Sequence, residues 1–422
     1  MASVSKHHVG VFVRVKPTDR FASETIELLP DSKTLNIHTQ KEHSRGYINN
    51  QVLDWRFTTD GVLHNASQEE VYAKCASRLV ELTLDGYNNT LFAYGQTGSG
   101  KTYTMTGANG NFQHRGIIPR AISQLYKDID GRAESDITVR ISYLEIYKDK
   151  MYDLLCTLDG DGVSSNNLTI TEDDQSVTYV KGLSRPVART EEEALNLLFE
   201  GETNRTISEH MLNRHSSRSH CIFTIYCESH SKTQSNTKYT TSKFNFVDLA
   251  GSERLAKTQS VGQTQEEARY INTSLTFLEQ AVIALEDKKR SHVPYRQCVL
   301  THLLKDSLGG KCSTVMIGNI WGEETQLEET LSTLRFASRV MNIPSQPAVN
   351  TFFDHFILCK QHEKEIATLR KELAMYDTLT NRNQVNYEPL SDIQVTDVRE
   401  QIRRFVDNDI EEIDIINMRQ VL

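Results

Sequence analysis

The chain has 422 residues, of which 38% are hydrophobic and 24% are charged, a composition typical of folded globular proteins. Its formal net charge of -9 at pH 7 disfavours a generally basic nucleic-acid binder. No apolar run approaches the roughly 18 residues of a membrane span, the polar N-terminus carries no secretory signal, and the 7 cysteines lack zinc-site spacing. We therefore expect one large or two smaller domains in a reducing, intracellular compartment.

Alternating strand and helix patterns between residues 9 and 342 predict an α/β architecture. Four segments alternate apolar with polar residues or run apolar, as strands do: 9–15, 138–147, 220–228 and 242–249. Capping-box patterns predict one helix that begins at Ser67 and stops at Gly86, and another that begins at Thr190 and ends near Gly201. Apolar residues at spacings of three and four predict a longer helix over residues 268–285, with one face toward the core.

The composition changes after Ile343. Pro344 and Pro347 are three residues apart and cannot both lie inside a helix, which predicts a linker. Two heptads of apolar residues follow, and a last amphipathic helix is predicted around Val398. The heptad residues, too few to establish a coiled coil, are Ile366, Leu369, Leu373 and Tyr376.

A glycine-rich phosphate-binding motif follows a strand candidate at residues 90–94. Its glycines let backbone N–H groups face phosphate oxygens, Lys101 adds positive charge, and the Thr102 hydroxyl can ligate Mg2+. A plain glycine turn is the alternative, but chance produces the pattern in only about one or two such chains in a hundred. The predicted nucleotide loop consists of Gly95, Gln96, Thr97, Gly98, Ser99, Gly100, Lys101 and Thr102.

Two later segments carry groups that a nucleotide hydrolase needs. A predicted strand ends in Asp248, which can hold Mg2+ through water, and the following Gly251 N–H can reach a terminal phosphate. The other segment, residues 213–220, has serine hydroxyls that can donate to phosphate or orient water, and Arg218 can pair with a carboxylate of the first segment. Taken alone, this serine-rich segment is explained as well by a polar loop.

Together, the sequences GQTGSGKT, NRHSSRSH and DLAGSER resemble, in this order, the phosphate loop, switch I and switch II of the kinesin motor domain. The resemblance covers roughly residues 9–350 and includes YLEIY at 143–147 and HVPYR at 292–296. It implies the P-loop NTPase kinesin motor fold, a mixed central β-sheet with helices on both faces, with ATP and Mg2+ as cofactors. It divides the chain into a motor domain (1–342), a neck linker (343–350) and a neck with a short helical C-terminal extension (351–422).

The resemblance assigns further nucleotide contacts. It implies that Arg14 and Pro17 flank the adenine and that Tyr103 stacks on it; exposed strand residues and a packed ring are the alternatives. Lys16 stands where the family usually has an arginine, which keeps the charge but loses the planar guanidinium. The resemblance also adds switch residues to the ATP site: Asn213, Ser216, Ser217 and Gly251.

The resemblance implies a catalytic arrangement as well. A bridge between Arg218 and Glu253 would close the switches around ATP, and Ser217 would position the attacking water and join Thr102 and Asp248 at the metal. Glu253 would help relay the proton of that water, while Lys101 stabilises charge on the leaving phosphate. A GTPase switch is disfavoured, because the sequence has no Asn-Lys-x-Asp motif for guanine selection.

The family binds tubulin through the switch II helix and its flanking loops, and an acidic filament surface fits a local basic cluster. For an isolated lysine pair, a solvated loop is the alternative. The implied contacts are Lys288, Lys289, Arg290, Tyr295, Arg296 and Lys305. Kinesins commonly have more polar or basic residues where this chain has Gln297, Cys298, Val299 and His302, so the strength of microtubule binding is open.

The linker resembles that of kinesins with an N-terminal motor, which generally move toward microtubule plus ends. Pro344 and Pro347 remove two backbone donors, so we expect weaker or differently registered docking. Residues 198–204, 277–280, 372–381 and 411–416 look like kinesin-9, a family associated with cilia and flagella.

The sequence thus favours an ATP-hydrolysing, plus-end-directed microtubule motor of the cytoplasm and cytoskeleton, in the axoneme of a cilium or flagellum. Axonemal proteins and a second copy of the chain are further candidate partners, and neither nucleic acid nor a membrane span is expected. The alternative is a nucleotide-gated microtubule-binding or regulatory protein without transport activity, which the two prolines of the linker keep open.

Overall fold

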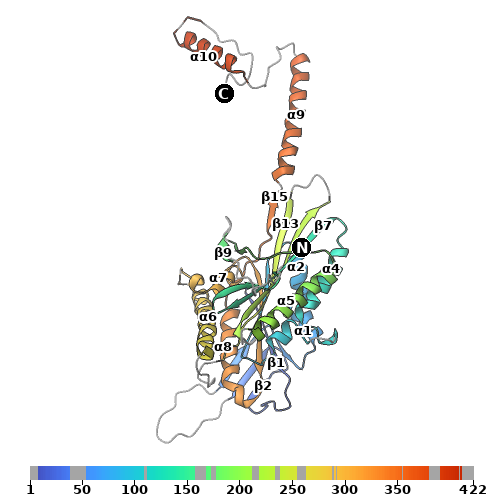
Figure 1. The fold of residues 1–422 in the computed structure, drawn as a ribbon, viewed down its shortest axis with the longest axis vertical. Helices are drawn as coiled ribbons and strands as arrows, with labels where there is room; N and C mark the ends of the chain where they lie inside the picture. Colours follow the sequence, from blue (N-terminus) through green and yellow to red (C-terminus); the bar gives the residue numbers. More distant parts are fainter. Residues whose placement is uncertain are drawn as a thin grey trace. The chain divides into compact units, whose positions relative to one another are not determined.

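The computed structural model describes residues 8–38, 54–108, 112–156, 168–172, 177–211, 218–232, 238–253, 263–287, 289–290, 292–353, 355–379, 390–407 and 409–410. The chain divides into two compact units, Met1–Phe352 and Phe353–Leu422. The first unit contains a large sheet with helices packed on it (Figure 1).

Ten strands form the main sheet within the described part of the chain. They are β1 (Gly10–Lys16), β5 (Gly61–His64), β6 (Asn89–Tyr94), β7 (Ser135–Tyr147), β8 (Lys150–Asp153), β11 (Val187–Ala188), β12 (His220–Ser231), β13 (Lys238–Asp248), β14 (Ser313–Trp321) and β15 (Thr351–Phe353). Their order is β11-β7-β12-β13-β6-β14-β1-β5, with β8 paired to β7 and β15 to β13. The pairs β13–β6, β6–β14, β14–β1 and β1–β5 are parallel, whereas β11, β7, β12 and β13 pair antiparallel, so the sheet is mixed.

Two small antiparallel sheets accompany the main one. One has the order β2-β3-β4, with bounds Ile26–Leu28, Thr34–His38 and Asp54–Thr58, and the other pairs β9 (Thr169–Glu172) with β10 (Thr178–Lys181). The four strands predicted from their apolar patterns appear in the structure as β1, β7, β12 and β13, and the strand candidate at residues 90–94 appears as β6.

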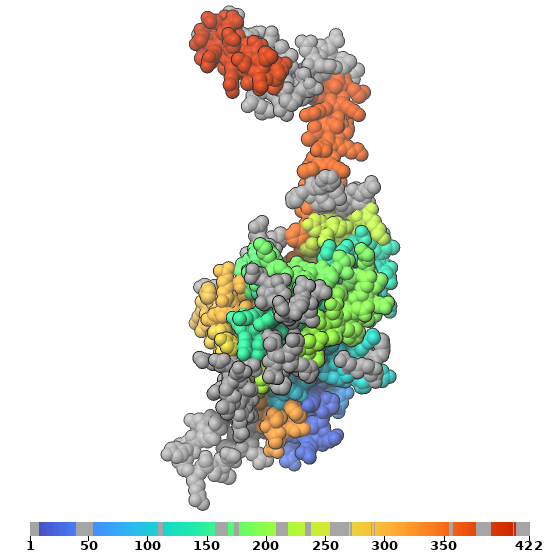
Figure 2. Space-filling view, in the orientation of Figure 1, coloured from blue at the N-terminus to red at the C-terminus, as the bar shows by residue number. Residues whose placement is uncertain are grey.

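Helices cover both faces of the main sheet (Figure 1). Their bounds are α1 (Gln68–Cys75), α2 (Ser77–Leu84), α3 (Lys101–Met105), α4 (Ile117–Asp130), α5 (Glu191–Met211), α6 (Gln263–Glu286), α7 (Val299–Leu303) and α8 (Leu327–Met341), with short 3-10 helices at Phe112–His114, Tyr295–Gln297 and Glu324–Gln326. Leu79, Ile122 and Leu198 bring α2, α4 and α5 into one hydrophobic core, while Leu278 and Phe336 bring α6 and α8 into another. In Figure 2, the green surface of α5 and the yellow surface of α6 accordingly lie on opposite flanks.

Two helix predictions need correction. The helix predicted to run from Ser67 to Gly86 is two helices, α1 and α2, which meet at Ala76. The helix predicted to end near Gly201 continues as α5 to Met211, so that boundary was wrong. A Cβ atom at Gly201 would lie 2.2 Å from the ring of Tyr143, so glycine serves close packing between α5 and β7 rather than ending the helix.

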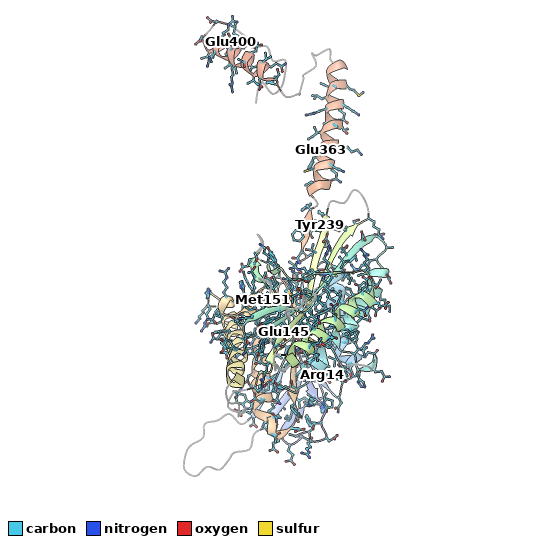
Figure 3. All side chains as sticks on the ribbon, in the orientation of Figure 1. Arg14, Glu145, Met151, Tyr239, Glu363 and Glu400 are labelled. Atoms are coloured by element: carbon cyan, nitrogen blue, oxygen red, sulfur yellow. The ribbon has the colours of Figure 1, made fainter. Side chains whose placement is uncertain are left out.

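The second unit consists of α9 (His355–Leu379) and α10 (Asp392–Val406), which carry the labels Glu363 and Glu400 in Figure 3. The predicted heptad residues of α9 are exposed, with Leu369 56% accessible. A capping box of Ser391 and Gln394 begins α10. Among the residues that the structure describes, no helix is long and apolar enough to cross a lipid bilayer.

Candidate nucleotide-binding site

The predicted phosphate loop connects β6, whose residues are all buried, to α3. Gly95 has a φ of +150°, and a Cβ atom there would lie 2.1 Å from the Asn319 carbonyl oxygen of β14. Gly100 precedes α3 with a φ of +96°, in the left-handed region that favours glycine. The loop therefore depends on glycine for its close passage against β14 and for its turn into the helix.

Lys101 is buried beneath this loop. Its Nζ atom donates hydrogen bonds to the carbonyl oxygens of Gly95 at 2.9 Å and Gln96 at 3.0 Å. Burial lowers the pKa of Lys101, and the negative charges of Asp248 and Glu253 oppose that shift. A cation is thus held where the loop amides are expected to receive phosphate oxygens.

Two predicted magnesium ligands meet beside the loop. The Thr102 hydroxyl donates a hydrogen bond of 2.6 Å to Oδ2 of Asp248. Oδ1 of Asp248 is buried and has no hydrogen-bond partner among the described residues. A hydroxyl and a carboxylate with a buried free oxygen are ligands that Mg2+ accepts, so the residues present fit this ion.

Arg205 is a further residue near this pair, which the sequence motifs did not single out. It lies on α5, is 3% exposed, and its Nη1 atom is 3.8 Å from Oδ2 of Asp248. Its charge therefore acts on the same carboxylate from the helix before switch I. Neither periodicity nor a motif identifies Arg205 in the sequence, because its proximity to Asp248 arises from the fold and joins positions more than forty residues apart.

Glu253 contacts the phosphate loop directly. Oε2 accepts a hydrogen bond from the Thr97 N–H at 2.8 Å, and Oε1 accepts one from the Thr97 hydroxyl at 2.6 Å. A Cβ atom on Gly251 would lie 2.2 Å from both Oε2 of Glu253 and the Thr97 hydroxyl oxygen, so a larger residue there would displace these two side chains. The bridge between Glu253 and Arg218 stays a prediction.

The residues predicted to surround the adenine differ in their exposure. Arg14, labelled in Figure 3, is buried and donates to Gln68 at 2.8 Å and to the Thr104 hydroxyl at 2.9 Å. Burial lowers the pKa of Arg14, and its guanidinium carbon is 5.4 Å from the Tyr103 ring centre. Tyr103 and Pro17 are exposed, so they are accessible to a base whereas Arg14 supports the ring from within.

Lys16 keeps a contact with the loop despite replacing the arginine usual in the family. Its Nζ atom donates to the Gly98 carbonyl at 2.9 Å and lies 3.7 Å from the ring centre of Trp321. This cation–π contact joins the ends of β1 and β14 to the phosphate loop. Trp321 was not among the predicted site residues.

Four predicted site residues lie outside the described part of the chain. They are Asn213, Ser216, Ser217 and Lys288.

The predicted microtubule-binding cations include an internally paired group. Glu172 of β9 accepts hydrogen bonds from Arg296 at 2.9 Å and Lys305 at 2.8 Å, and it lies 3.2 Å from Nε2 of His302. These bonds, that of Lys305 foremost, lower the pKa of Glu172 to about 2. The sequence motifs did not predict this acid, which reduces the positive charge available on that surface.

The other described residues of the predicted microtubule surface do not bond to Glu172. Lys289 and Arg290 are exposed, and Nε of Arg290 lies 3.7 Å from a carboxylate oxygen of Asp287. Tyr295 is half-buried and donates its hydroxyl to the Leu308 carbonyl at 2.6 Å. Burial raises the pKa of Tyr295 to about 12.

The linker residues 343–350 lie along the first unit. Ile343 accepts a hydrogen bond from the Val9 N–H, and the Ser345 hydroxyl donates to the Cys312 carbonyl at 3.1 Å. The N–H of Ala348 donates to Lys311, and that of Asn350 donates to Gly86 at 3.0 Å. These hydrogen bonds of the linker therefore involve residues other than Pro344 and Pro347.

A protein-family model described as the kinesin motor domain matches residues 14–343. The chain is 55% identical over 417 residues to kinesin-like protein KIF9 of Mus musculus, a match that covers 99% of this chain and 53% of the relative. It is 46% identical over 410 residues to kinesin-like protein KLP1 of Chlamydomonas reinhardtii, covering 97% of this chain and 52% of that protein. The chain therefore spans about half the length of these relatives.

Solved structures agree with this family. A fast kinesin superimposes with a TM-score of 0.73 at 34% identity, covering 83% of this chain and 96% of the other. A KIF14 dimer bound to AMP-PNP and a microtubule superimposes with a TM-score of 0.71 at 33% identity, covering 81% and 96%. The predicted mixed sheet with helices on both faces is confirmed, and the chain belongs to the kinesin motor-domain family.

Proposed function

We propose that this chain hydrolyses ATP and uses the reaction to move along microtubules. Kinesin motor domains are microtubule-stimulated ATP hydrolases. The observation that carries the proposal here is the joining of Thr102 to Asp248 at 2.6 Å, beside the buried Lys101 and with Glu253 bonded to the phosphate loop. These residues supply a cation, metal ligands and a carboxylate around one phosphate site.

The proposed chemistry assigns one task to each group. Thr102 and Asp248, the latter through water, would hold Mg2+, which offsets phosphate charge when bound. Lys101 and the loop amides stabilise charge on the leaving phosphate, and Ser217 orients the attacking water. Glu253, bridged to Arg218, accepts the proton of that water through a second water.

The remaining proposed ATP contacts surround this centre. We assign the adenine to Pro17, Tyr103 and the supporting Arg14, and the phosphates to the loop residues together with Asn213, Ser216 and Gly251. We assign the microtubule surface to Lys288, Lys289, Arg290, Tyr295, Arg296 and Lys305. The KIF14 structure in complex with a microtubule supports a filament partner for this family.

A gliding assay on polarity-marked microtubules, run beside ATP turnover with and without filaments, tests the function. We expect turnover to rise with filaments and the filaments to move as plus-end-directed motors move them. The hydrogen bonds of Ser345 to Cys312 and of Asn350 to Gly86 support that direction, because a docked linker is expected to bond to the core in this way. Turnover that filaments leave unchanged contradicts the proposed function.

The two linker prolines favour a second candidate, a nucleotide-gated microtubule-binding protein without transport. Pro344 and Pro347 cannot donate hydrogen bonds to a docked strand. This function would be identified by three results together: the chain binds and releases filaments as the nucleotide changes, the filaments stimulate ATP turnover, and the filaments never glide.

A cytoskeletal location follows from filament binding, and we place the protein more specifically in the axoneme of a cilium or flagellum. The resemblance of the switch II helix and tail to kinesin-9 supports that placement. Axonemal proteins are the expected partners. Fluorescently tagged full-length protein in ciliated cells should follow the axoneme, whereas uniform labelling of cytoplasmic microtubules contradicts the placement.

We also propose that α9 pairs with a second copy. Ile366, Leu369, Leu373 and Tyr376 expose an apolar row with heptad spacing, and Cys359 lies one heptad before Ile366. In a parallel, in-register pair, the two copies of Cys359 would face each other. Oxidation should therefore crosslink the parent but not Cys359→Ser, and a monomeric mass at micromolar concentration contradicts the pairing.

A further inference from the structure

A buried histidine joins three segments of the first unit. His220, the first residue of β12, is 3% exposed. Its Nδ1 accepts a hydrogen bond from the Ala250 N–H at 3.0 Å, and its Nε2 lies 2.8 Å from the Ser274 hydroxyl oxygen. Ala250 lies in the switch II loop, two residues after the end of β13, and Ser274 belongs to α6. One imidazole ring therefore links switch I, switch II and the switch II helix.

The partners of the ring define its protonation. A backbone amide can only donate, so Nδ1 of His220 carries the lone pair and Nε2 carries the proton that it donates to Ser274. Burial, together with the positive charge of Lys101, lowers the pKa of His220 to about 3. The ring is therefore neutral at physiological pH and fixed as one tautomer.

The position of Ala250 makes this link relevant to the nucleotide site. Ala250 lies between Asp248, which binds Thr102, and Gly251, which packs against Thr97 and Glu253. On the other side of the ring, Ser274 precedes the buried Leu275 of α6. A displacement of α6 must therefore either move the Ala250 segment or break a hydrogen bond to His220.

We propose that His220 is a positioning residue that couples helix α6 to the nucleotide site by holding Ala250 and Ser274 on the two nitrogens of one ring. The proposal rests on the proposed function, since α6 adjoins the surface assigned to microtubules. Filament binding that shifts α6 changes the placement of the Asp248–Gly251 segment through this ring.

Three substitutions separate the two bonds. His220→Asn keeps an acceptor near the position of Nδ1 and loses the bond to Ser274, whereas His220→Gln keeps a donor near the position of Nε2 and loses the bond to Ala250. Ser274→Ala removes the α6 partner without changing the ring. His38, an exposed histidine of β3 that pairs with Asp54, offers the matched control His38→Asn.

The experiment measures ATP turnover by the full chain with and without microtubules, together with KM for ATP and the unfolding temperature. We expect His220→Asn, His220→Gln and Ser274→Ala to lower the ratio of stimulated to basal turnover about two- to tenfold, the effect of losing one net hydrogen bond. KM should stay within about twofold, because no nucleotide contact is removed. The double variant His220→Asn/Ser274→Ala should be little worse than either single one, and His38→Asn should match the parent.

Two outcomes overturn the proposal. One is a parental stimulation ratio in both His220→Asn and Ser274→Ala. The other is an equal loss of basal and stimulated turnover with a lower unfolding temperature in His220→Asn while Ser274→Ala behaves as the parent, since this describes a packing role alone.

A parent that microtubules do not stimulate contradicts the proposed function instead, and hydrogen exchange of α6 amides then tests the coupling. With ADP and AMP-PNP compared, a nucleotide-dependent change in the parent that is lost in both variants supports the role of His220. No change in the parent, or a change that both variants keep, overturns it.

Discussion

Glu253 and Thr97 are joined by two hydrogen bonds, one from the Thr97 amide at 2.8 Å and one from its hydroxyl at 2.6 Å. The amide belongs to the phosphate loop, where backbone N–H groups receive phosphate oxygens. The carboxylate of Glu253 thus takes a donor that the loop offers to phosphate. In this arrangement the proposed proton acceptor is hydrogen-bonded to the phosphate loop.

Thr97→Val tests whether Thr97 restrains Glu253, because the substitution keeps the shape and the amide of Thr97 but removes the hydroxyl. We expect basal ATP turnover without microtubules to rise about two- to tenfold, since a charge-assisted hydrogen bond that restrains Glu253 is lost. Thr368→Val is the control, because the Thr368 hydroxyl bonds to the Lys364 carbonyl of α9, outside the nucleotide site. Basal turnover that does not rise in Thr97→Val would show that this bond does not restrain the carboxylate.

Lys101→Ala should remove most nucleotide binding without unfolding the protein. The buried ammonium supplies charge to the phosphates, while its loss also removes a desolvated cation from the interior. We expect affinity for a fluorescent ADP analogue to fall about 100-fold or more, with the unfolding temperature kept. Lys74→Ala, which removes an exposed lysine of α1 paired with Glu70, should bind as the parent. Near-parental affinity in Lys101→Ala would refute the phosphate assignment.

The sequence was informative where function depends on neighbouring residues. The phosphate loop and the strand that ends at Asp248 could be predicted, because their chemistry follows from local order and glycine content. Glu172 could not, since its partners Arg296 and Lys305 lie more than 120 residues away. At Gly201 the sequence suggested a wrong answer. A glycine in a helical pattern predicts that the helix ends there, but this glycine allows α5 to pack closely against Tyr143.

Glu172→Gln should strengthen microtubule binding. The substitution removes the acid that pairs with Arg296 and Lys305, so both cations become available to an acidic filament. We expect cosedimentation at low salt to show a lower Kd by about two- to tenfold, and the gain to shrink at high salt. Glu228→Gln, in an exposed acid of β12 that pairs with His230, is the control. If Glu172→Gln bound microtubules equally or more weakly than the parent, the pairing of Glu172 with Arg296 and Lys305 would not limit microtubule affinity.

The pH dependence of this cluster has a definite sign. The pKa of Glu172 in the folded chain is about 2, below its ordinary value of 4.5. Its stabilising contribution is therefore complete above the ordinary value and is lost as the pH falls from there toward 2. The difference in unfolding temperature between the parent and Glu172→Gln should persist from pH 6 to pH 8 and shrink below about pH 4. A difference that first disappears near pH 7 would contradict this assignment.

Phe352→Ala should weaken linker docking. Phe352 stacks on Tyr239 with ring centres 5.7 Å apart, and Tyr239, labelled in Figure 3 near the start of β13, stacks on His230 at 4.9 Å. An aromatic pair contributes about 0.5–1.5 kcal/mol beyond its buried area, so the docked fraction should fall severalfold and gliding should slow. Tyr239→Phe keeps the ring and should glide as the parent. If Phe352→Ala glided at the speed of the parent, the stacking of Phe352 on Tyr239 would not contribute to linker docking.

The paired switches give the sharpest prediction. Glu253→Ala should bind ATP and microtubules yet hydrolyse very slowly, because Lys101 and Asp248 still hold nucleotide and metal while the bridge and the proton relay are lost. Arg218→Ala should behave in the same way. Since both residues serve one closure step, the double variant should be little worse than either single one.

Steady-state turnover of the two single variants and the double variant, with and without microtubules, decides between a bridge and independent roles. Losses that multiply in the double variant would contradict a shared bridge. If Glu253 served only as a partner of Thr97, its alanine variant would instead resemble Thr97→Val and hydrolyse ATP at least as fast as the parent without filaments. The two substitutions act oppositely on basal turnover under the proposed mechanism, because Thr97→Val frees the carboxylate of Glu253 for catalysis and Glu253→Ala removes it.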